Sequence, residues 1–409
     1  MHSGPGCSSK ISCLIGQGEG YAGGNTVPCT NASESEIVYG GEEKLQSVIE
    51  GAFKVIDADL YVVLSGCTSD IVGDDTGKVT GEFQKLDMPI VYAETGGFKS
   101  NNYVSHEVVV NAIIDQYVDK FKSDKKVDKG LVNVFASIPY QDPYWNGNLE
   151  EIKRILEEIG LKVNILFGNS SGGVEEWKTI PNAEFNIVVS AWAGLGIAAH
   201  LEDKYGTKFI HFPYLPVGGI ETSKFLRLVG DFGGLDKFAV EAVITKEEGK
   251  YYTYLDTTMD FLLEFKYGLP RSFYAILDAS YAVGFSKFLF NELGIIPKRH
   301  FIIDDTPERF QNDVREQLEN TSETRRSKVD FEVDGGIIQE EIALDERNQR
   351  VLILGSAWDR EFAKKIGADL LILGVPVTYR LVLSCGYAGY RGGIKVIEDI
   401  YDRVLDTYR

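Results

Sequence analysis

Three cysteines in the first 67 residues combine a reactive residue type with an ordered spacing: Cys7 in HSGPGC, Cys29 in VPCTN and Cys67 in SGCTSD. Each is predicted to lie at a turn or at the carboxyl end of a strand, where open α/β sheets hold ligands. Thiolates are soft ligands that select zinc, copper(I) or iron–sulfur clusters. The sequence contains no CxxC pair, which disfavours a zinc ribbon. The spacing suits three loops that converge on one large inorganic group.

The cysteines alone leave other interpretations open. Free cysteines are often buried as small apolar side chains, so packing remains an alternative to metal binding. Three thiolates also leave a four-ligand iron–sulfur cluster incomplete, so a fourth ligand or a second subunit would have to close the site. Cys13 is interpreted as a buried thiol or one just outside the ligand set, and Cys385 as a packed residue beside a glycine-rich turn.

Polar residues near the cysteines are further candidates. Three aspartates follow Cys67, namely Asp70, Asp74 and Asp75. They are predicted to cap the N-terminus of the following helix rather than to do acid–base work. Glu94 and His106 flank a GGF turn; His106 is interpreted as a core or capping histidine, with proton transfer as the alternative. His2 is expected either to hydrogen-bond near Cys7 or to be disordered, and His200 and His211 to be structural.

Alternating strand and helix patterns must position these residues, and they predict an α/β fold of three tandem Rossmann-like, doubly wound domains with mainly parallel sheets. The predicted domains are residues 1–125, which carry the cysteines, 126–265, and 266–409 with a C-terminal helix. Predicted strands cover 59–66, 89–95, 131–137, 162–168, 185–191, 208–214, 299–305, 328–334, 350–355 and 369–376. Residues 1–41 are predicted to be loop, and helices are predicted at 42–56, 106–123, 148–160, 270–283 and 307–320.

Composition excludes several classes of function. The 409 residues include 61 acidic and 42 basic side chains, a net charge of −19, which argues against a nucleic-acid partner. No apolar run is long enough for a membrane span. Five cysteines, an odd number, and the lack of a secretory signal favour a reducing compartment, so we expect a cytoplasmic protein. There is no P-loop motif; residues 355–365, GSAWDREFAKK, are a candidate phosphate turn.

The ordered motifs HSGPGC, the cysteine at position 29, SEIVYGGEEKL and GCTSDIVGDD resemble the nitrogenase component 1 superfamily. The resemblance continues in VNVFASIPYQDPYWNGNLEEIKRILEEIGLKVNILF and in GYAGYRGGIKVIEDIYDRVL, and so covers most of the chain. This family includes the subunits of dinitrogenase, its cofactor-assembly scaffold, and the protochlorophyllide and Ni-sirohydrochlorin reductases. HSG at the first motif, in place of HGP, is more similar to the β-type than to the α-type subunit.

In that family, Cys7, Cys29 and Cys67 match the three cysteines that one subunit gives to an iron–sulfur cluster at the subunit interface. The cluster is an 8Fe-7S P-cluster in nitrogenase and a 4Fe-4S cluster in the tetrapyrrole reductases. The resemblance implies an oxidoreductase subunit, a homologous α-type partner in an α2β2 heterotetramer, and electron delivery by an ATP-dependent iron protein. The alternatives are a homodimeric tetrapyrrole reductase of the Ni-sirohydrochlorin type, a cofactor-assembly scaffold, and a metal-free structural protein.

Departures from the family pattern limit what the resemblance implies. Gly97 falls where the family has a serine that can ligate the oxidised P-cluster, so serine-linked redox switching is not expected. No cysteine lies between Cys67 and Cys385, so the α-type cysteine that anchors an iron–molybdenum-type cofactor has no counterpart. The chain is therefore not expected to hold the substrate-reducing cofactor. The usual first strand of the third domain is expected to be absent between Ala279 and Ser286.

Overall fold

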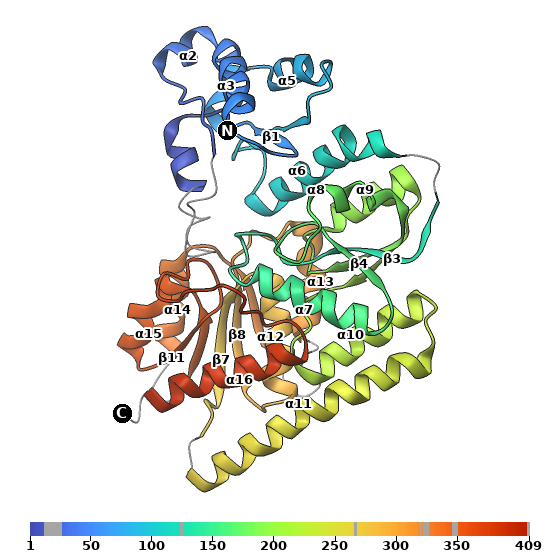
Figure 1. The fold of residues 1–409 in the computed structure, drawn as a ribbon. Helices are drawn as coiled ribbons and strands as arrows, with labels where there is room; N and C mark the ends of the chain where they lie inside the picture. Colours follow the sequence, from blue (N-terminus) through green and yellow to red (C-terminus); the bar gives the residue numbers. More distant parts are fainter. Residues whose placement is uncertain are drawn as a thin grey trace.

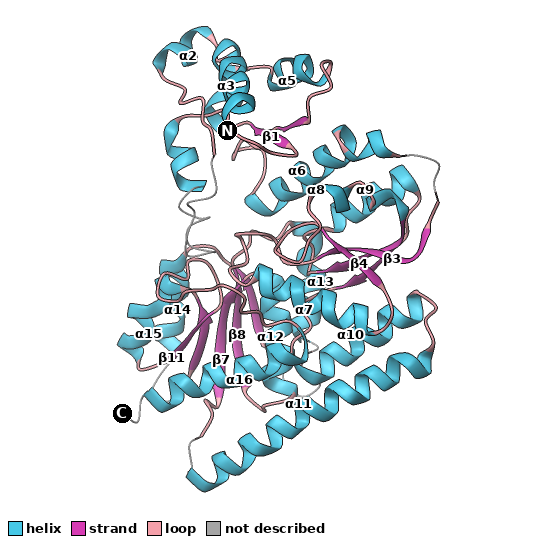
Figure 2. Ribbon diagram, in the orientation of Figure 1, coloured by secondary structure: helices cyan, strands magenta, loops and turns pink. Residues whose placement is uncertain are grey.

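Three parallel β-sheets with surrounding helices form the architecture (Figures 1 and 2). The computed structural model describes residues 1–11, 27–122, 126–265, 268–319, 321, 327–345 and 351–406. Every strand pair in these ranges is parallel, which confirms the predicted α/β class with parallel sheets. The division into domains at 125/126 and 265/266 remains a prediction. In the described part of the chain, no helix is both long and apolar enough to cross a membrane.

The first sheet is small and carries the N-terminal cysteine motifs. It pairs β1 (Tyr61–Leu64) with β2 (Ile90–Ala93). Its helices are α2 (Glu34–Tyr39), α3 (Glu42–Val55), α4 (Cys67–Val72), α5 (Thr76–Gln84) and α6 (Asn102–Gln116), the last followed by the 3-10 turn η1 (Val118–Phe121). A compact apolar core of Leu45, Ile49, Val63, Val79 and Ile90 joins the sheet to α3 and α5.

The expectation that residues 1–41 are loop is wrong in two places. Residues 5–11 are helical, and α2 follows Ser33. The Ser33 N–H donates to the Glu36 carboxylate at 2.6 Å, so a capping box of Ser33 and Glu36 begins α2.

The second sheet has the strand order β4-β3-β5-β6, with β3 (Asp128–Phe135), β4 (Lys162–Ile165), β5 (Ala183–Val189) and β6 (Phe209–Phe212). The chain winds outward in opposite directions from β3 and β5, which makes a topological switch point between these two strands. Helices α7 (Trp145–Glu158), α8 (Val174–Trp177) and α9 (Leu195–Tyr205) and the turn η2 (Ile180–Asn182) connect the strands. Gly160 follows α7 at φ +96°, the left-handed backbone that ends a helix.

The third sheet has the order β11-β10-β7-β8-β9, a doubly wound arrangement around β7. Its strands are β7 (Ser272–Leu277), β8 (Ile296–Ile302), β9 (Lys328–Phe331), β10 (Leu352–Gly355) and β11 (Asp369–Ile372). Its helices are α12 (Ala279–Asn291), α13 (Glu308–Glu319), α14 (Gly335–Asp345) and α15 (Arg360–Ile366), with η3 (Ala357–Asp359) before α15.

The predicted helix over 270–283 is wrong for residues 272–277, whereas residues 279–286, where the usual first strand was expected to be absent, are helical. Residues 272–277 form β7, the central strand, and α12 begins only after Asp278, whose carboxylate accepts the Tyr281 N–H at 3.1 Å. SFYAIL is buried at every position, so it lacks the alternation of a half-exposed strand. Periodicity does not separate such an apolar run from a buried helix.

The second and third sheets share one apolar core, and helices from both sides join them. The hairpin of α10 (Gly218–Phe232) and α11 (Lys237–Phe265) crosses the base of the molecule in Figure 1, and the C-terminal α16 (Gly389–Asp406) packs against α7, α10 and α11. The Tyr144 hydroxyl, next to α7, donates to the Ile372 carbonyl of β11 at 2.5 Å. The contacts of α16 and the hydrogen bond of Tyr144 thus join elements of the second and third sheets.

Candidate metal centre

The first residues of the chain lie along the edge of β1. The His2 N–H donates to the Leu64 carbonyl at 2.8 Å, and the Gly66 N–H returns to the His2 carbonyl at 2.9 Å. Beside them, the Thr30 N–H donates to the Met1 carbonyl at 3.1 Å, and the Ala32 N–H to the Ser3 carbonyl at 3.0 Å. The three backbone segments that lead to the predicted ligands are therefore neighbours, hydrogen-bonded to one another.

The sulfurs of Cys29 and Cys67 each accept a backbone N–H. Cys29 is half-buried; its sulfur lies 3.4 Å from the Ser3 carbonyl oxygen and accepts the Asn31 N–H at 3.3 Å. Cys67 begins α4, is half-buried, and accepts the Gly97 N–H at 3.1 Å. Cys7 lies in the helical residues 5–11 and is exposed. All three are free thiols, and none belongs to a fully buried residue.

These residues fit an iron–sulfur cluster by the chemistry of their donor set. Thiols bind iron as thiolates, and N–H groups that donate to the sulfurs stabilise the thiolate charge. The site offers three thiols and two such N–H groups. Within the described ranges, no three cysteine, histidine, aspartate or glutamate side chains come together as the ligands of a single metal ion. That the three sulfurs bind one shared cluster stays a prediction.

A buried polar contact that sequence reasoning missed links three of the motifs. His2 is buried, with Nε2 2.9 Å from Asp74 Oδ2 and Nδ1 3.2 Å from Thr30 Oγ1. The Gly41 N–H donates to Asp74 Oδ1 at 2.8 Å, and a Cβ on Gly41 would lie 2.9 Å from both Asp74 Oδ2 and His2 Cε1. Burial lowers the pKa of His2, although the Asp74 carboxylate opposes this shift. The HSG, YGG and GDD motifs thus contact one another in the folded chain.

The three aspartates after Cys67 have three different roles. Asp75 caps α5 as predicted, because its carboxylate accepts the Lys78 N–H at 2.7 Å. Asp74 bonds instead to His2 and to Gly41 at the start of α3, so the capping prediction is wrong for this residue. Asp70 pairs with the Lys99 ammonium at 2.9 Å.

The other candidates have structural contacts. His106 packs against the Phe167 ring, and burial lowers the pKa of His106 to about 4, so it is neutral near pH 7. The Cys385 sulfur accepts a hydrogen bond from Arg380 at 3.4 Å, and burial raises the pKa of its thiol. The remaining contacts are those of His200 with Asp115 at 2.8 Å, His211 with the Ser190 carbonyl at 2.7 Å, and Glu94 with Lys99 at 2.6 Å. Cys13 lies outside the described residues.

In the candidate phosphate turn at 355–365, a side chain of the turn itself bonds to a backbone N–H group. The Asp359 carboxylate accepts the Ser356 N–H at 2.8 Å, so this N–H is not available to a phosphate oxygen. This contact argues against phosphate binding there.

Comparison with known proteins decides the family. The model of the family described as "Nitrogenase component 1 type Oxidoreductase" matches residues 1–405. The chain belongs to this family. It is 26% identical to the nitrogenase molybdenum-iron protein beta chain of Methanococcus maripaludis, over 100% of this chain and 89% of that protein. It is 24% identical to a subunit of the light-independent protochlorophyllide reductase of Chaetosphaeridium globosum, over 90% of this chain and 71% of that protein.

Among solved structures, "Nitrogenase Cp1 at pH 6.5" matches with a TM-score of 0.79 at 19% identity, and the alignment covers 100% of this chain and 88% of that chain. This likeness supports the fold. As a nitrogenase component 1 type protein, the chain is an oxidoreductase, as the resemblance implied.

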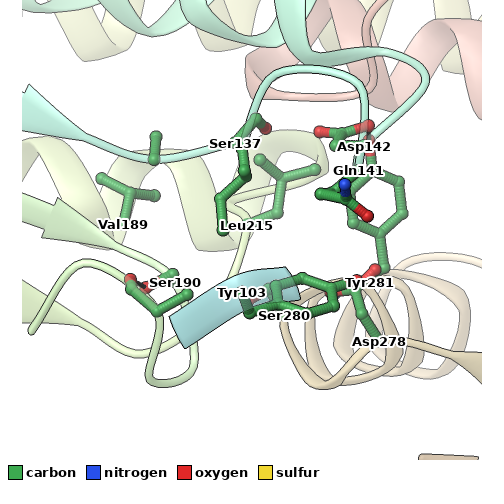
Figure 3. A pocket seen from close by; sticks show the side chains of 13 residues that line it. Tyr103, Ser137, Gln141, Asp142, Val189, Ser190, Leu215, Asp278, Ser280 and Tyr281 are labelled. Carbon is green, nitrogen blue, oxygen red and sulfur yellow. Dashed lines mark hydrogen bonds between the residues drawn. The ribbon is translucent and has the colours of Figure 1, made fainter. Parts of the chain in front are cut away.

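A second candidate site in this component 1 type chain is the small cavity at the switch point of the second sheet (Figure 3). It lies between the ends of β3, β5 and β7, with Tyr103 of α6 beside it. The cavity measures about 40 Å³, room for two or three water molecules. Burial and the neighbouring Asp304 raise the pKa of its Asp278 to about 8.

Proposed function

We propose that the chain is the β-type subunit of a nitrogenase or nitrogenase-like two-component reductase. In this proposal Cys7, Cys29 and Cys67 hold half of an interface iron–sulfur cluster, either a P-cluster of the 8Fe-7S type or a 4Fe-4S cluster. The observation that carries the proposal is the hydrogen bonding of the three cysteine-bearing segments to one another through His2, Ser3 and Thr30. The similarity to a nitrogenase beta chain and to a protochlorophyllide reductase subunit supports it.

The residues of this chain would bind and orient the cluster. Cys67 is held at the start of α4 and Cys29 beside Ser3, so the thiolates need little reorganisation on binding. The N–H groups of Gly97 and Asn31 point at these sulfurs and stabilise their negative charge. When bound, the cluster supplies one-electron transfer, here between an ATP-dependent iron protein and the catalytic site of the partner subunit.

The surface around the cysteines suits a protein partner. Apolar side chains on α2, on α4 and in the turn after β2 are exposed: Ile37, Val38, Tyr39, Ile71 and Phe98. Tyr39 is 87% and Ile71 74% exposed, and α2 has no buried residue. Apolar side chains exposed together in this way are typical of surfaces covered by another subunit. We propose that a homologous α-type subunit covers this face, completes the cluster and assembles as an α2β2 heterotetramer.

The same surface would also serve a homodimer, in which two copies give six thiolates to the cluster. The similarity to a protochlorophyllide reductase subunit keeps a tetrapyrrole substrate as the second candidate. Subunit stoichiometry separates the two: two chain types in the purified particle support the β-type subunit, and one chain type supports the homodimer. An assembly scaffold would bind cluster and partner but reduce no substrate.

Anaerobic purification with iron and sulfide analysis tests the proposal. Cys67→Ala is expected to lose most of the bound iron, because it removes a proposed ligand. Cys385→Ala is the matched control: that thiol bonds to Arg380 on the loop before α16, and its removal is expected to leave the iron in place. Equal iron in wild type and Cys67→Ala would contradict the proposed ligand set.

A further inference from the structure

The turn that follows β2 places a backbone N–H donor, that of Gly97, next to the Cys67 sulfur. The turn is closed by a hydrogen bond from the Lys99 N–H to the Gly96 carbonyl at 2.8 Å. Between these residues, the Gly97 N–H donates to the Cys67 sulfur at 3.1 Å. The positive end of a backbone N–H dipole, from a different segment of the chain, therefore lies beside the sulfur.

A lysine ties this turn to the helix that carries Cys67. The Lys99 ammonium lies 2.9 Å from Asp70 Oδ2 and 2.6 Å from Glu94 Oε2. Asp70 stands one turn after Cys67 on α4, and its side chain is only 5% exposed. Glu94 directly follows β2, so Lys99 connects the end of the strand to α4 across the turn. The hydrogen bonds to Glu94 and Asp70 raise the pKa of Lys99, which keeps it charged.

The turn fits closely against α4. A Cβ on Gly96 would lie 2.4 Å from Asp70 Oδ2, so a side chain at position 96 would push the turn away from the helix. At Gly97, in contrast, a Cβ would lie 3.4 Å from the Cys67 sulfur, an ordinary contact. Close packing at 96 and the ion pairs of Lys99 together set the distance between the Gly97 N–H and the sulfur.

We propose that Lys99 is a positioning residue that holds the Gly97 N–H on the Cys67 sulfur and thereby raises the reduction potential of the cluster bound there. The inference rests on the proposed function. Reduction adds negative charge to the cluster and its thiolates, and an N–H dipole fixed at a sulfur stabilises that charge. Losing the tether leaves the thiolate ligand in place but frees the donor.

The test uses the anaerobically purified complex and a redox titration followed by EPR. In Lys99→Met the midpoint potential is expected to shift to a more negative value with iron content retained, and Lys99→Arg, which keeps both ion pairs, is expected to stay near wild type. Lys78→Met is the charge control, because Lys78 pairs with Glu42 on the surface and does not contact the turn. An unchanged midpoint in Lys99→Met, or an equal shift in Lys78→Met, would overturn the inference.

A second readout does not need the cluster. In cluster-free full-length protein, hydrogen exchange of the Gly97 amide is expected to be at least tenfold faster in Lys99→Met than in wild type, and unchanged exchange would also overturn the inference. If wild type itself bound no iron, the proposed function would fail while the exchange result still decided whether Lys99 positions the turn. If Lys99→Met does not fold, Glu94→Gln replaces it, because this variant weakens only the exposed ion pair of Lys99. We expect the midpoint potential and the Gly97 exchange rate to change in the same direction but by less. No change in either would count against the role of Lys99.

Discussion

Replacement of Asp74 by alanine is the sharpest test of how the N-terminal motifs are held together. The Asp74 side chain is 6% exposed and accepts two hydrogen bonds, from His2 Nε2 at 2.9 Å and from the Gly41 N–H at 2.8 Å. Hydrogen bonds to a charged group contribute about 1.5–3 kcal/mol each, and the variant leaves both donors buried without a partner. We therefore expect the attachment of the N-terminal segment to β1 to weaken by about 3–6 kcal/mol.

The effect should be local, and hydrogen exchange with mass spectrometry measures it. The reporters are the amides of His2, Thr30 and Gly66, which join the first residues, the segment before α2 and the end of β1. A loss of about 3 kcal/mol corresponds to exchange on the order of a hundredfold faster wherever local opening controls the rate. Amides of β7 and β10, in the third sheet, should keep their protection.

The adjacent Asp75 provides the matched control. It is exposed and caps α5, so Asp75→Ala should cost about 1 kcal/mol and speed exchange only in α5. If the proposed cluster site is correct, Asp74→Ala should also lose iron, because the segment that carries Cys7 detaches, whereas Asp75→Ala should keep it. Unchanged exchange of the Thr30 and Gly66 amides in Asp74→Ala would refute the reasoning.

Three further variants test other parts of the structure. Gly41→Ala should destabilise the first sheet by roughly 1–3 kcal/mol in urea unfolding, since its Cβ would lie 2.9 Å from Asp74 and His2; wild-type stability would contradict the close packing. The pKa of Asp278 is about 8, above the usual range, so folding favours its protonated form and this contribution to stability is lost as pH rises from about 4 to 8. The unfolding free energy of Asp278→Asn relative to wild type should therefore be higher at pH 8 than at pH 5. A difference between the two proteins that does not change with pH would refute this. Asn148→Ala leaves the Tyr387 and Ala388 N–H groups buried without an acceptor and should lower the unfolding free energy by about 2–5 kcal/mol, measured by denaturant unfolding; a loss below about 1 kcal/mol would show that other groups replace the amide.

The sequence predicted those elements whose residue pattern is locally distinctive. Strands such as β1 and β10 are short apolar runs bounded by glycine or polar residues, and both lie within the predicted ranges. The fully buried SFYAIL run was predicted as helix, because burial on both faces removes the alternation that identifies a strand. The packing of α16 against α7, α10, α11 and β11 depends on tertiary contacts between distant segments, which no local pattern encodes.

The cysteines were recognisable as candidates by residue type, but the groups around them were not. His2 and Asp74 lie at opposite ends of the first 75 residues, and only the folded chain shows that they meet. The donors to the sulfurs were harder still to predict, since Gly97 and Asn31 contribute backbone N–H groups that every non-proline residue possesses. The residue type at these two positions therefore does not predict that their backbone N–H groups meet the sulfurs.

This choice of donors has a consequence for how the site is tuned. A backbone N–H is not removed by ordinary substitution, so its effect on a sulfur changes only when the turn that carries it moves. Both turns are anchored by lysines: Lys99 bonds to Asp70 and Glu94, and the Lys44 ammonium donates to the Asn31 carbonyl at 3.0 Å. In the proposed cluster site, substitutions at such anchors are therefore expected to shift the properties of the bound cluster while every proposed thiol ligand is kept.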